Sequence, residues 1–149
     1  MLEIGEKAPL FALENQKSET IELTKILEEN KRVMLVIYPK DDTPGCTSQV
    51  CRVRDDYSEL LAMNLVILGL NHDNARSHQK FIDKYQLPFD ILIDKNKEII
   101  KKYKSTKMFF KNETIQRSVY IIDYDQTIIY TCKGQQDNQK IINFLKTFA

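Results

Sequence analysis

The apolar run from Arg32 to Tyr38, RVMLVIY, constrains the fold of this chain more than any other segment. Charged residues precede it and Pro39 follows it directly. A continuous apolar run of this length is typical of a central strand buried on both faces, as in the parallel sheets of α/β proteins. A second run of the same character, LVILGL, extends from Leu65 to Leu70. We therefore expect an α/β fold organised around these two strands.

The spacing of apolar residues predicts the other elements on either side of these strands. Helices are expected from Pro44 through Leu61 and at 74–85, 97–103 and 137–148, with further strands at 90–93, 118–122 and 127–132. A weak hairpin formed by 10–13 and 20–23 precedes a short helix that Thr24 would cap, whereas the polar segment 105–116 is predicted to be a loop. This order predicts a mixed central sheet flanked by helices, with an N-terminal β-hairpin extension, which is compatible with a thioredoxin-like fold.

Composition and charge argue against several classes of function. At 149 residues the chain is expected to form one domain, 1–149, with its own core. Its 22 basic and 21 acidic residues leave a net charge of +1, so the charge does not favour nucleic acid as a partner. No apolar run reaches the roughly 20 residues that span a bilayer, and no signal peptide is apparent, so no membrane partner is expected. Three cysteines are too few for a disulfide-stapled secreted scaffold, which indicates a reducing, cytoplasmic setting.

The segment from Tyr38 to Asp56, YPKDDTPGCTSQVCRVRDD, joins the first buried strand to the predicted helix. Thr43 suits the N-cap and Pro44 the first helical position, which puts Cys46 in the first turn. Backbone N–H groups there lack intrahelical partners, and together with the helix dipole they favour a negative charge. Cys46 is therefore a candidate nucleophilic thiolate at the carboxyl edge of the sheet. On position alone, a buried structural cysteine is an equally open interpretation.

Cys51 favours the functional interpretation. It follows Cys46 by five residues, about 140° around a helix, which places it off the apolar stripe. In an intact helix the two α-carbons would be about 8.6 Å apart, whereas a disulfide requires less than about 7 Å. The two cysteines can therefore form a disulfide only if the start of the helix unwinds. The resulting hypothesis is that oxidation is coupled to local unfolding of this helix.

Pro39, Thr43 and Cys46 fit the P-x-x-x-T-x-x-C pattern of peroxiredoxins. The whole segment from Tyr38 to Asp56 closely resembles the Q-type branch, also called bacterioferritin comigratory protein, and SHQKFIDKY and RSVYIID resemble that branch at matching distances. The resemblance covers nearly the whole chain. It implies a thioredoxin-like fold and the thiol-dependent reduction of hydrogen peroxide and organic hydroperoxides, with no cofactor and no metal.

The resemblance also implies a role for each matching residue. Cys46 would be the peroxidatic cysteine and would become a sulfenic acid. Cys51 would be the resolving cysteine, and thioredoxin or a similar dithiol protein would reduce the intramolecular disulfide that the two form. Thr43 would hydrogen-bond the peroxide, Pro39 would shield the thiolate from water, and Arg117 would hold the thiolate and polarise the peroxide. Resolution within one chain permits a monomer, so we expect a monomer or at most a weak dimer.

Several alternatives remain open. A thiol–disulfide oxidoreductase would use the same two cysteines, but that class normally has C-x-x-C, and a redox-regulated binding protein would turn over no peroxide. Gln49 is either a supporting residue of the site or a solvated helix residue. Cys132 is interpreted as a small buried residue of a strand, with a regulatory or intermolecular disulfide as the alternative. His72 and His78 lack companions for a metal site and are interpreted as structural or surface residues.

Overall fold

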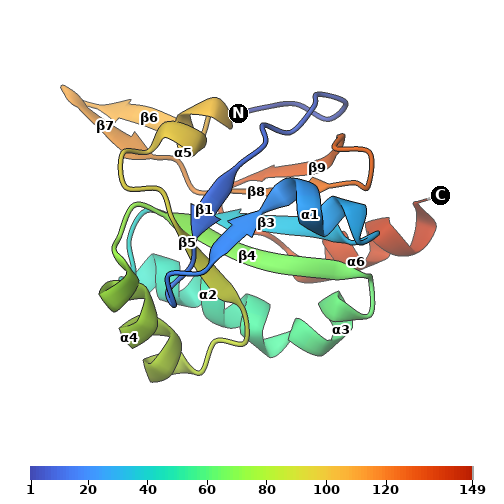
Figure 1. Ribbon diagram of the computed structural model, residues 1–149, viewed down its shortest axis with the longest axis horizontal. Coiled ribbons are helices and arrows are strands. Elements are labelled where there is room, and N and C mark those ends of the chain that lie inside the picture. The colour runs from blue at the N-terminus through green and yellow to red at the C-terminus, as the bar shows by residue number, and fades with distance from the viewer. Residues whose placement is uncertain (149) are drawn as a thin grey trace.

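A mixed five-stranded sheet forms the centre of the protein, whose computed structural model describes residues 1–148 (Figure 1). The strands lie in the order β5 (Asp90–Ile93), β4 (Leu65–Asn71), β3 (Arg32–Ile37), β8 (Ser118–Ile122) and β9 (Ile128–Lys133). The first three run parallel to one another, whereas β8 is antiparallel to β3 and β9 is antiparallel to β8. The expectation of a mixed central sheet is confirmed.

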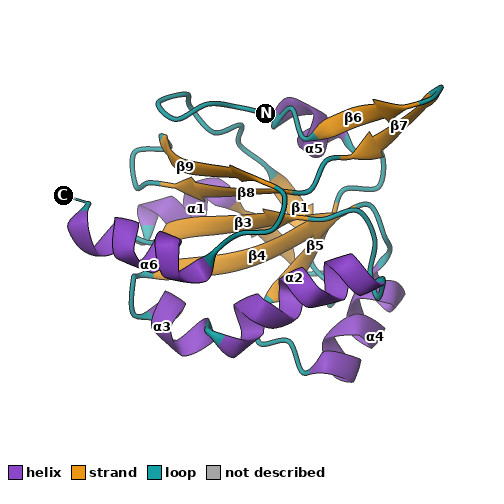
Figure 2. Ribbon diagram, turned by 180° about the vertical axis from the view of Figure 1, so that it is seen from behind, coloured by secondary structure: helices purple, strands orange, loops and turns teal. Residues whose placement is uncertain are grey.

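Helices cover both faces of this sheet (Figure 2). One face packs against α2 (Pro44–Asp55), α3 (Tyr57–Leu61), α4 (Ala75–Tyr85) and α6 (Asn138–Thr147). The other face packs against the N-terminal segment, α1 (Leu23–Glu28) and α5 (Glu98–Lys102). The N-terminal hairpin is present as β1 (Ala12–Glu14) and β2 (Thr20–Glu22), and Glu22 rather than Thr24 occupies the N-cap of α1. This arrangement is the predicted thioredoxin-like α/β fold.

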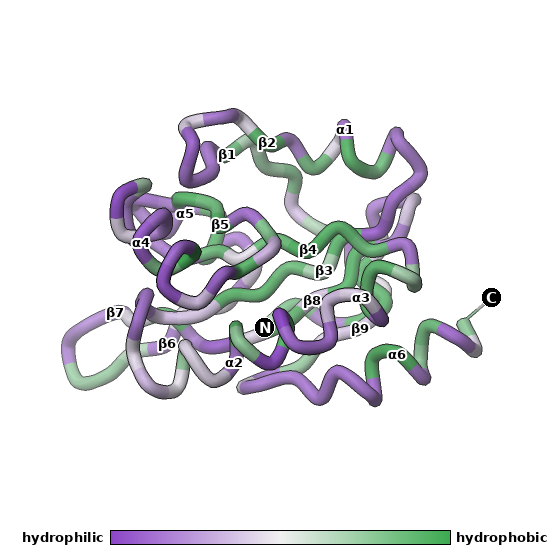
Figure 3. Tube along the Cα trace, turned by 90° about the horizontal axis from the view of Figure 1, so that it is seen from below, coloured by the Kyte–Doolittle hydropathy of each residue, from purple (hydrophilic) through white to green (hydrophobic). Residues whose placement is uncertain are grey.

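The apolar run that predicted the fold forms β3, at the middle of the sheet. Met34 and Val36 pack into the cluster shared with α2 and α6, whereas Val33, Leu35 and Ile37 pack into the cluster shared with α1. All five side chains are at most 1% exposed. Full burial of such a side chain contributes about 1.5–3 kcal/mol, so both faces of β3 stabilise the fold. Figure 3 shows the same pattern, with hydrophobic residues concentrated along the central strands.

The segment 105–116 is a hairpin, so its prediction as a loop was wrong. β6 (Thr106–Phe109) and β7 (Asn112–Ile115) pair antiparallel, and Phe110 and Lys111 form the turn. Most of both strands is exposed, so they lack the apolar alternation of a half-buried strand. The turn also lacks the glycine that ordinarily marks a two-residue hairpin.

The helix predicted from Pro44 through Leu61 is divided at Asp56, whose backbone (φ −103°, ψ 16°) leaves the helical region. Val53 before the break and Leu60 after it are both fully buried, so the apolar spacing continues as if the helix were unbroken. Leu61, which that spacing assigns to the inner side, is 44% exposed.

Among residues 1–148, no helix is long and apolar enough to cross a membrane.

Candidate active site

The loop after β3 leads directly into α2, and Cys46 lies in the first turn of that helix. Thr43 occupies the N-cap position with an extended backbone (φ −108°, ψ 152°), and Pro44 is the first helical residue, as predicted. The Thr43 side chain does not cap the helix, however, because its Oγ1 donates to the carbonyl of Lys40 at 3.0 Å. The predicted N-cap position is therefore confirmed, although no side-chain hydrogen bond from Thr43 caps the helix. The first backbone bond of the helix runs from the Thr47 N–H to the Thr43 carbonyl at 2.7 Å, so the amide of Cys46 precedes it.

A guanidinium lies against the sulfur of Cys46. Arg117 directly precedes β8, and its Nη2 donates to Cys46 Sγ at 3.4 Å while its Nη1 donates to Gln49 Oε1 at 2.7 Å. Cys46 is 2% exposed and Gln49 is fully buried, so water screens these contacts poorly. Gln49 is neutral, and Arg117 forms no ion pair with a carboxylate of residues 1–148. The positive charge of Arg117 is therefore available to a negative charge on the sulfur.

Gly45 leaves the space that this guanidinium occupies. A Cβ atom at position 45 would lie 3.1 Å from Arg117 Nη2 and 3.8 Å from its Cζ. A larger residue would therefore displace either the guanidinium or the first turn of α2. Pro39 and Thr43 lie in the loop that leads into this turn, and both are half-buried.

Cys51 lies farther along the same helix. α2 is continuous through both cysteines, and both are free thiols. Cys51 is half-buried, and burial raises the pKa of its thiol, which favours the protonated form. Because the intact helix holds the two α-carbons about 8.6 Å apart, a bond between the two sulfurs requires α2 to unwind.

Three side-chain amides contact the carbonyls along one side of α2. The donor and acceptor pairs are Gln135 Nε2 to Gly45 O (3.2 Å), Gln136 Nε2 to Gln49 O (3.5 Å) and Asn138 Nδ2 to Arg52 O (3.0 Å). Asn138 also donates to the Asp56 carboxylate at 2.9 Å. A neutral hydrogen bond contributes about 0.5–1.5 kcal/mol, and one to a charged group contributes about 1.5–3 kcal/mol. These amides therefore hold the C-terminal end of α2 more strongly than its first two turns, which contain both cysteines and are held in addition by Arg117.

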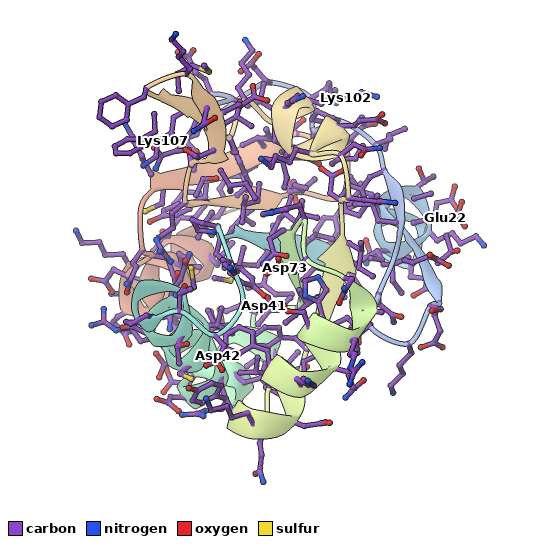
Figure 4. All side chains as sticks on the ribbon, turned by 90° about the vertical axis from the view of Figure 1, so that its left-hand side faces the viewer. Glu22, Asp41, Asp42, Asp73, Lys102 and Lys107 are labelled. Atoms are coloured by element: carbon purple, nitrogen blue, oxygen red, sulfur yellow. The ribbon has the colours of Figure 1, made fainter. Side chains whose placement is uncertain are left out.

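Asp41 anchors the loop between β3 and α2 on the opposite side. Its carboxylate accepts hydrogen bonds from Tyr38 Oη (2.7 Å), Asn71 Nδ2 (3.0 Å), Ser77 Oγ (2.8 Å) and His78 Nδ1 (2.6 Å). The other ring nitrogen of His78 lies 3.0 Å from the Leu92 carbonyl oxygen. Since a carbonyl only accepts, the Nε2 atom of His78 donates to Leu92, and its Nδ1 atom shares a short hydrogen bond with the Asp41 carboxylate. Figure 4 shows Asp41 beside Asp73, whose carboxylate accepts the Asp41 N–H at 2.8 Å.

The electrostatics of this cluster favour an ionised Asp41. Burial by itself would raise the pKa of Asp41, but the hydrogen bond and charge of His78, with hydrogen bonds from Tyr38 and Ser77, hold that pKa below its ordinary value. Burial and the neighbouring Asp41 raise the pKa of Tyr38 well above its ordinary value, so the phenol remains a donor. His78 is fully buried and Asp41 is 7% exposed. Breaking a buried pair of this kind costs about 3–5 kcal/mol, so the loop that delivers Cys46 is firmly anchored.

Some of these residues could not be identified from the sequence. Asp41 follows an apolar strand, but nothing in the sequence indicates that it pairs with His78. The structural interpretation of His78 is confirmed, because its side chain is fully buried. His72 is half-buried.

Cys132 lies in β9, as predicted, and is half-buried, with its Sγ 3.5 Å from the Gln135 carbonyl oxygen. Burial raises the pKa of the Cys132 thiol, which favours its protonated form.

Comparison with known proteins identifies a close set of relatives. The model of the AhpC/TSA family matches residues 4–131. The chain is 37% identical to peroxiredoxin Bcp of Bacillus subtilis over 150 residues, which covers 98% of this chain and 94% of that protein. It is 33% identical over 138 residues to the chloroplastic peroxiredoxin Q of Triticum aestivum, covering 93% of this chain and 62% of that protein. The crystal structure of peroxidoxin BcpB from Mycobacterium tuberculosis shares the fold, with a TM-score of 0.90 and 21% identity over 100% of this chain and 99% of that chain.

Proposed function

This chain belongs to the AhpC/TSA family, and from that membership we propose that it reduces hydrogen peroxide and organic hydroperoxides at Cys46. The resemblance to peroxiredoxins is confirmed by the relatives, so the enzyme class is that of a thiol-dependent peroxidase. One observation carries the assignment to Cys46. Its buried sulfur lies at the start of α2 and accepts a hydrogen bond from Arg117 at 3.4 Å.

In the first step the Cys46 thiolate attacks one oxygen of the peroxide and the O–O bond breaks. The sulfur keeps that oxygen and becomes a sulfenic acid. The other oxygen takes up a proton and leaves as water or an alcohol. Arg117 would stabilise the thiolate and the charge that develops on the peroxide oxygens. Thr43 would donate a hydrogen bond to the peroxide once its hydroxyl turns from the Lys40 carbonyl. Pro39 would exclude water from the sulfur.

In the second step Cys51 would resolve the sulfenic acid. Its sulfur attacks the Cys46 sulfur, an S–S bond forms, and the sulfenic oxygen leaves as water. The separation of the two cysteines in intact α2 supports unwinding of the helix before this step. A dithiol protein such as thioredoxin would then supply two electrons and two protons, which restores both thiols and leaves the dithiol protein oxidised.

Steady-state peroxide reduction coupled to thioredoxin tests this proposal on the wild type and on each Cys→Ser variant. Cys46→Ser should abolish peroxide consumption, whereas Cys51→Ser should consume a single equivalent and then stop. Reduction of insulin disulfides without peroxide turnover would instead indicate a thiol–disulfide oxidoreductase. Absence of both activities would indicate a redox-regulated binding protein.

Amide hydrogen exchange of residues 45–54 tests the unwinding separately. These amides should exchange faster in the oxidised protein than in the reduced protein. Equal protection in both states would contradict the coupling between disulfide formation and local unfolding.

We also propose that residues 1–149 act as one monomeric domain in the cytoplasm. Two apolar clusters on opposite faces of a single sheet support one domain. A resolving cysteine on the same helix as Cys46 supports a monomer, because resolution then needs no second chain. The low number of cysteines, three in 149 residues, supports a reducing compartment. Light scattering over a range of protein concentrations tests the monomer, and a mass twice that of the chain even in dilute solution would contradict it.

A further inference from the structure

The hairpin formed by β6 and β7 projects from the body of the molecule (Figure 2), and the side chains at its tip are apolar. Its base is anchored, because Ile115 is buried in the core and the Gln116 N–H donates to the Ser105 carbonyl at 2.7 Å. The rest of residues 1–148 leaves its tip uncovered. Met108, Phe109 and Phe110 are exposed by 65%, 62% and 88%.

Phe110 adopts a backbone conformation that does not suit it. Its φ of 57° is in the left-handed region, where glycine or asparagine ordinarily makes the turn. Its ring lies outside the core clusters, and it packs edge-on against the neighbouring ring of Phe109 with centroids 4.7 Å apart. Neither the turn nor the core accounts for this residue, so contact with something outside the molecule is the remaining physical explanation.

The hairpin and the segment before it are strongly basic. Residues 97–116 contain six lysines and two glutamates, a net charge of +4, whereas the whole chain carries +1. Glu113 is already paired with Lys101 at 3.2 Å. Lys104, Lys107 and Lys111 are exposed and form no ion pair within residues 1–148. Figure 4 shows Lys102 and Lys107 at the same end of the molecule, on α5 and β6. The apolar tip therefore lies among cationic side chains.

We propose that this hairpin docks on the surface of an anionic bilayer. Met108, Phe109 and Phe110 enter the boundary between headgroups and acyl chains, and the lysines lie against the lipid phosphates. A bilayer fits the tip better than a protein does. Three side chains at the end of a two-stranded hairpin cannot supply the roughly 1,000 Å² of a stable protein interface, and lysine is depleted in such interfaces. This proposal departs from the expectation from the sequence that the protein has no membrane partner.

Co-sedimentation of the full chain with vesicles tests the proposal without any measurement of peroxidase activity. The protein should bind vesicles of phosphatidylglycerol mixed with phosphatidylcholine, bind vesicles of phosphatidylcholine alone more weakly, and be released by salt. Phe110→Gly should lower the partition coefficient at least about fivefold. Because glycine suits the left-handed turn, the same variant should unfold at or above the wild-type temperature. Lys107→Gln with Lys111→Gln should weaken binding at least about tenfold.

Leu61→Ser is the matched control, since Leu61 is an exposed apolar residue of α3. It should bind anionic vesicles as the wild type does. Failure of the wild type to sediment with anionic vesicles would overturn the proposal, as would an equal loss of binding in the control. Self-association of the wild type without lipid, abolished by Phe110→Gly, would also overturn it by assigning the tip to an interface between copies of the chain.

Discussion

Ser48 offers a direct test of the coupling between helix unwinding and disulfide formation. It lies on α2 between the two cysteines and is partly exposed. A change at this position therefore alters the stability of the helix and leaves Cys46, Cys51 and Arg117 in place. Ser48→Ala should stabilise α2 and Ser48→Gly should destabilise it.

The size of the effect follows from helix propensities. Alanine is more favourable in a helix than serine by about 0.5 kcal/mol and than glycine by about 1 kcal/mol. If α2 must open before Cys51 attacks, the rate of disulfide formation is proportional to the population of the open helix. The alanine variant should then resolve about twofold more slowly than the wild type and the glycine variant about twofold faster, a spread of about fivefold.

The rate is measured by mixing reduced protein with one equivalent of peroxide and quenching at intervals. Mass spectrometry then counts sulfenic acid and disulfide at Cys46. Formation of the sulfenic acid should be equal in all variants, and only its conversion to the disulfide should differ. Lys80→Ala and Lys80→Gly, on the exposed side of α4, form the matched control pair and should change neither rate. The reasoning is refuted if the two Ser48 variants resolve at the same rate, or if the alanine variant is the faster one.

The remaining predictions concern Asp41 and Cys132. Asp41→Ala removes the acceptor of four hydrogen bonds and leaves the buried His78 without its partner, so urea unfolding should show a loss of about 3–5 kcal/mol. A loss below about 1 kcal/mol would contradict the anchoring role. The pKa of Asp41 is held below its ordinary value, so the ionised carboxylate contributes fully to the free energy of unfolding above the unfolded pKa of about 3.9. This contribution is lost as the pH falls further, so the difference in unfolding free energy between the wild type and Asp41→Asn should shrink below about pH 4. A difference that stays constant with pH would refute this reasoning. Cys132→Ser should leave thioredoxin-coupled turnover unchanged, and a clear fall would assign resolution partly to Cys132.

The elements that could be predicted from the sequence are those whose burial leaves a continuous or periodic signal. β3 is covered on both faces, so nearly all of its residues are apolar and the strand is evident. The hairpin at Thr106–Ile115 has the opposite character, since most of its side chains contact water on both sides. Its strands therefore carry no pattern, and its turn residue Phe110 is not one that a turn ordinarily selects. The break at Asp56 is hidden because α3 continues the inner stripe of α2.

The residues of the candidate site likewise differ in whether the local sequence predicts their positions. Thr43, Pro44 and the strand before them define where a helix starts, so the placement of Cys46 in the first turn follows from local rules. Arg117 lies 71 residues away in the sequence, and its approach to Cys46 depends on β8 lying beside β3. Only the resemblance to peroxiredoxins indicated that contact. The pairing of Asp41 with His78 has no local signal, because it forms only after α4 packs beside the sheet.

The two sides of the Cys46 site are held by separate contacts, and that separation suits a helix that opens and closes. On one side Asp41 fixes the loop through four side-chain hydrogen bonds, none of them to α2. On the other side the first two turns of α2 receive the neutral amides of Gln135 and Gln136 and the guanidinium of Arg117. Unwinding these turns breaks the second set of contacts and leaves the Asp41 contacts intact, so the loop can stay in place while the helix unwinds. Because the loop stays anchored and Arg117 directly precedes the sheet strand β8, rewinding α2 after reduction returns Cys46 to the same guanidinium.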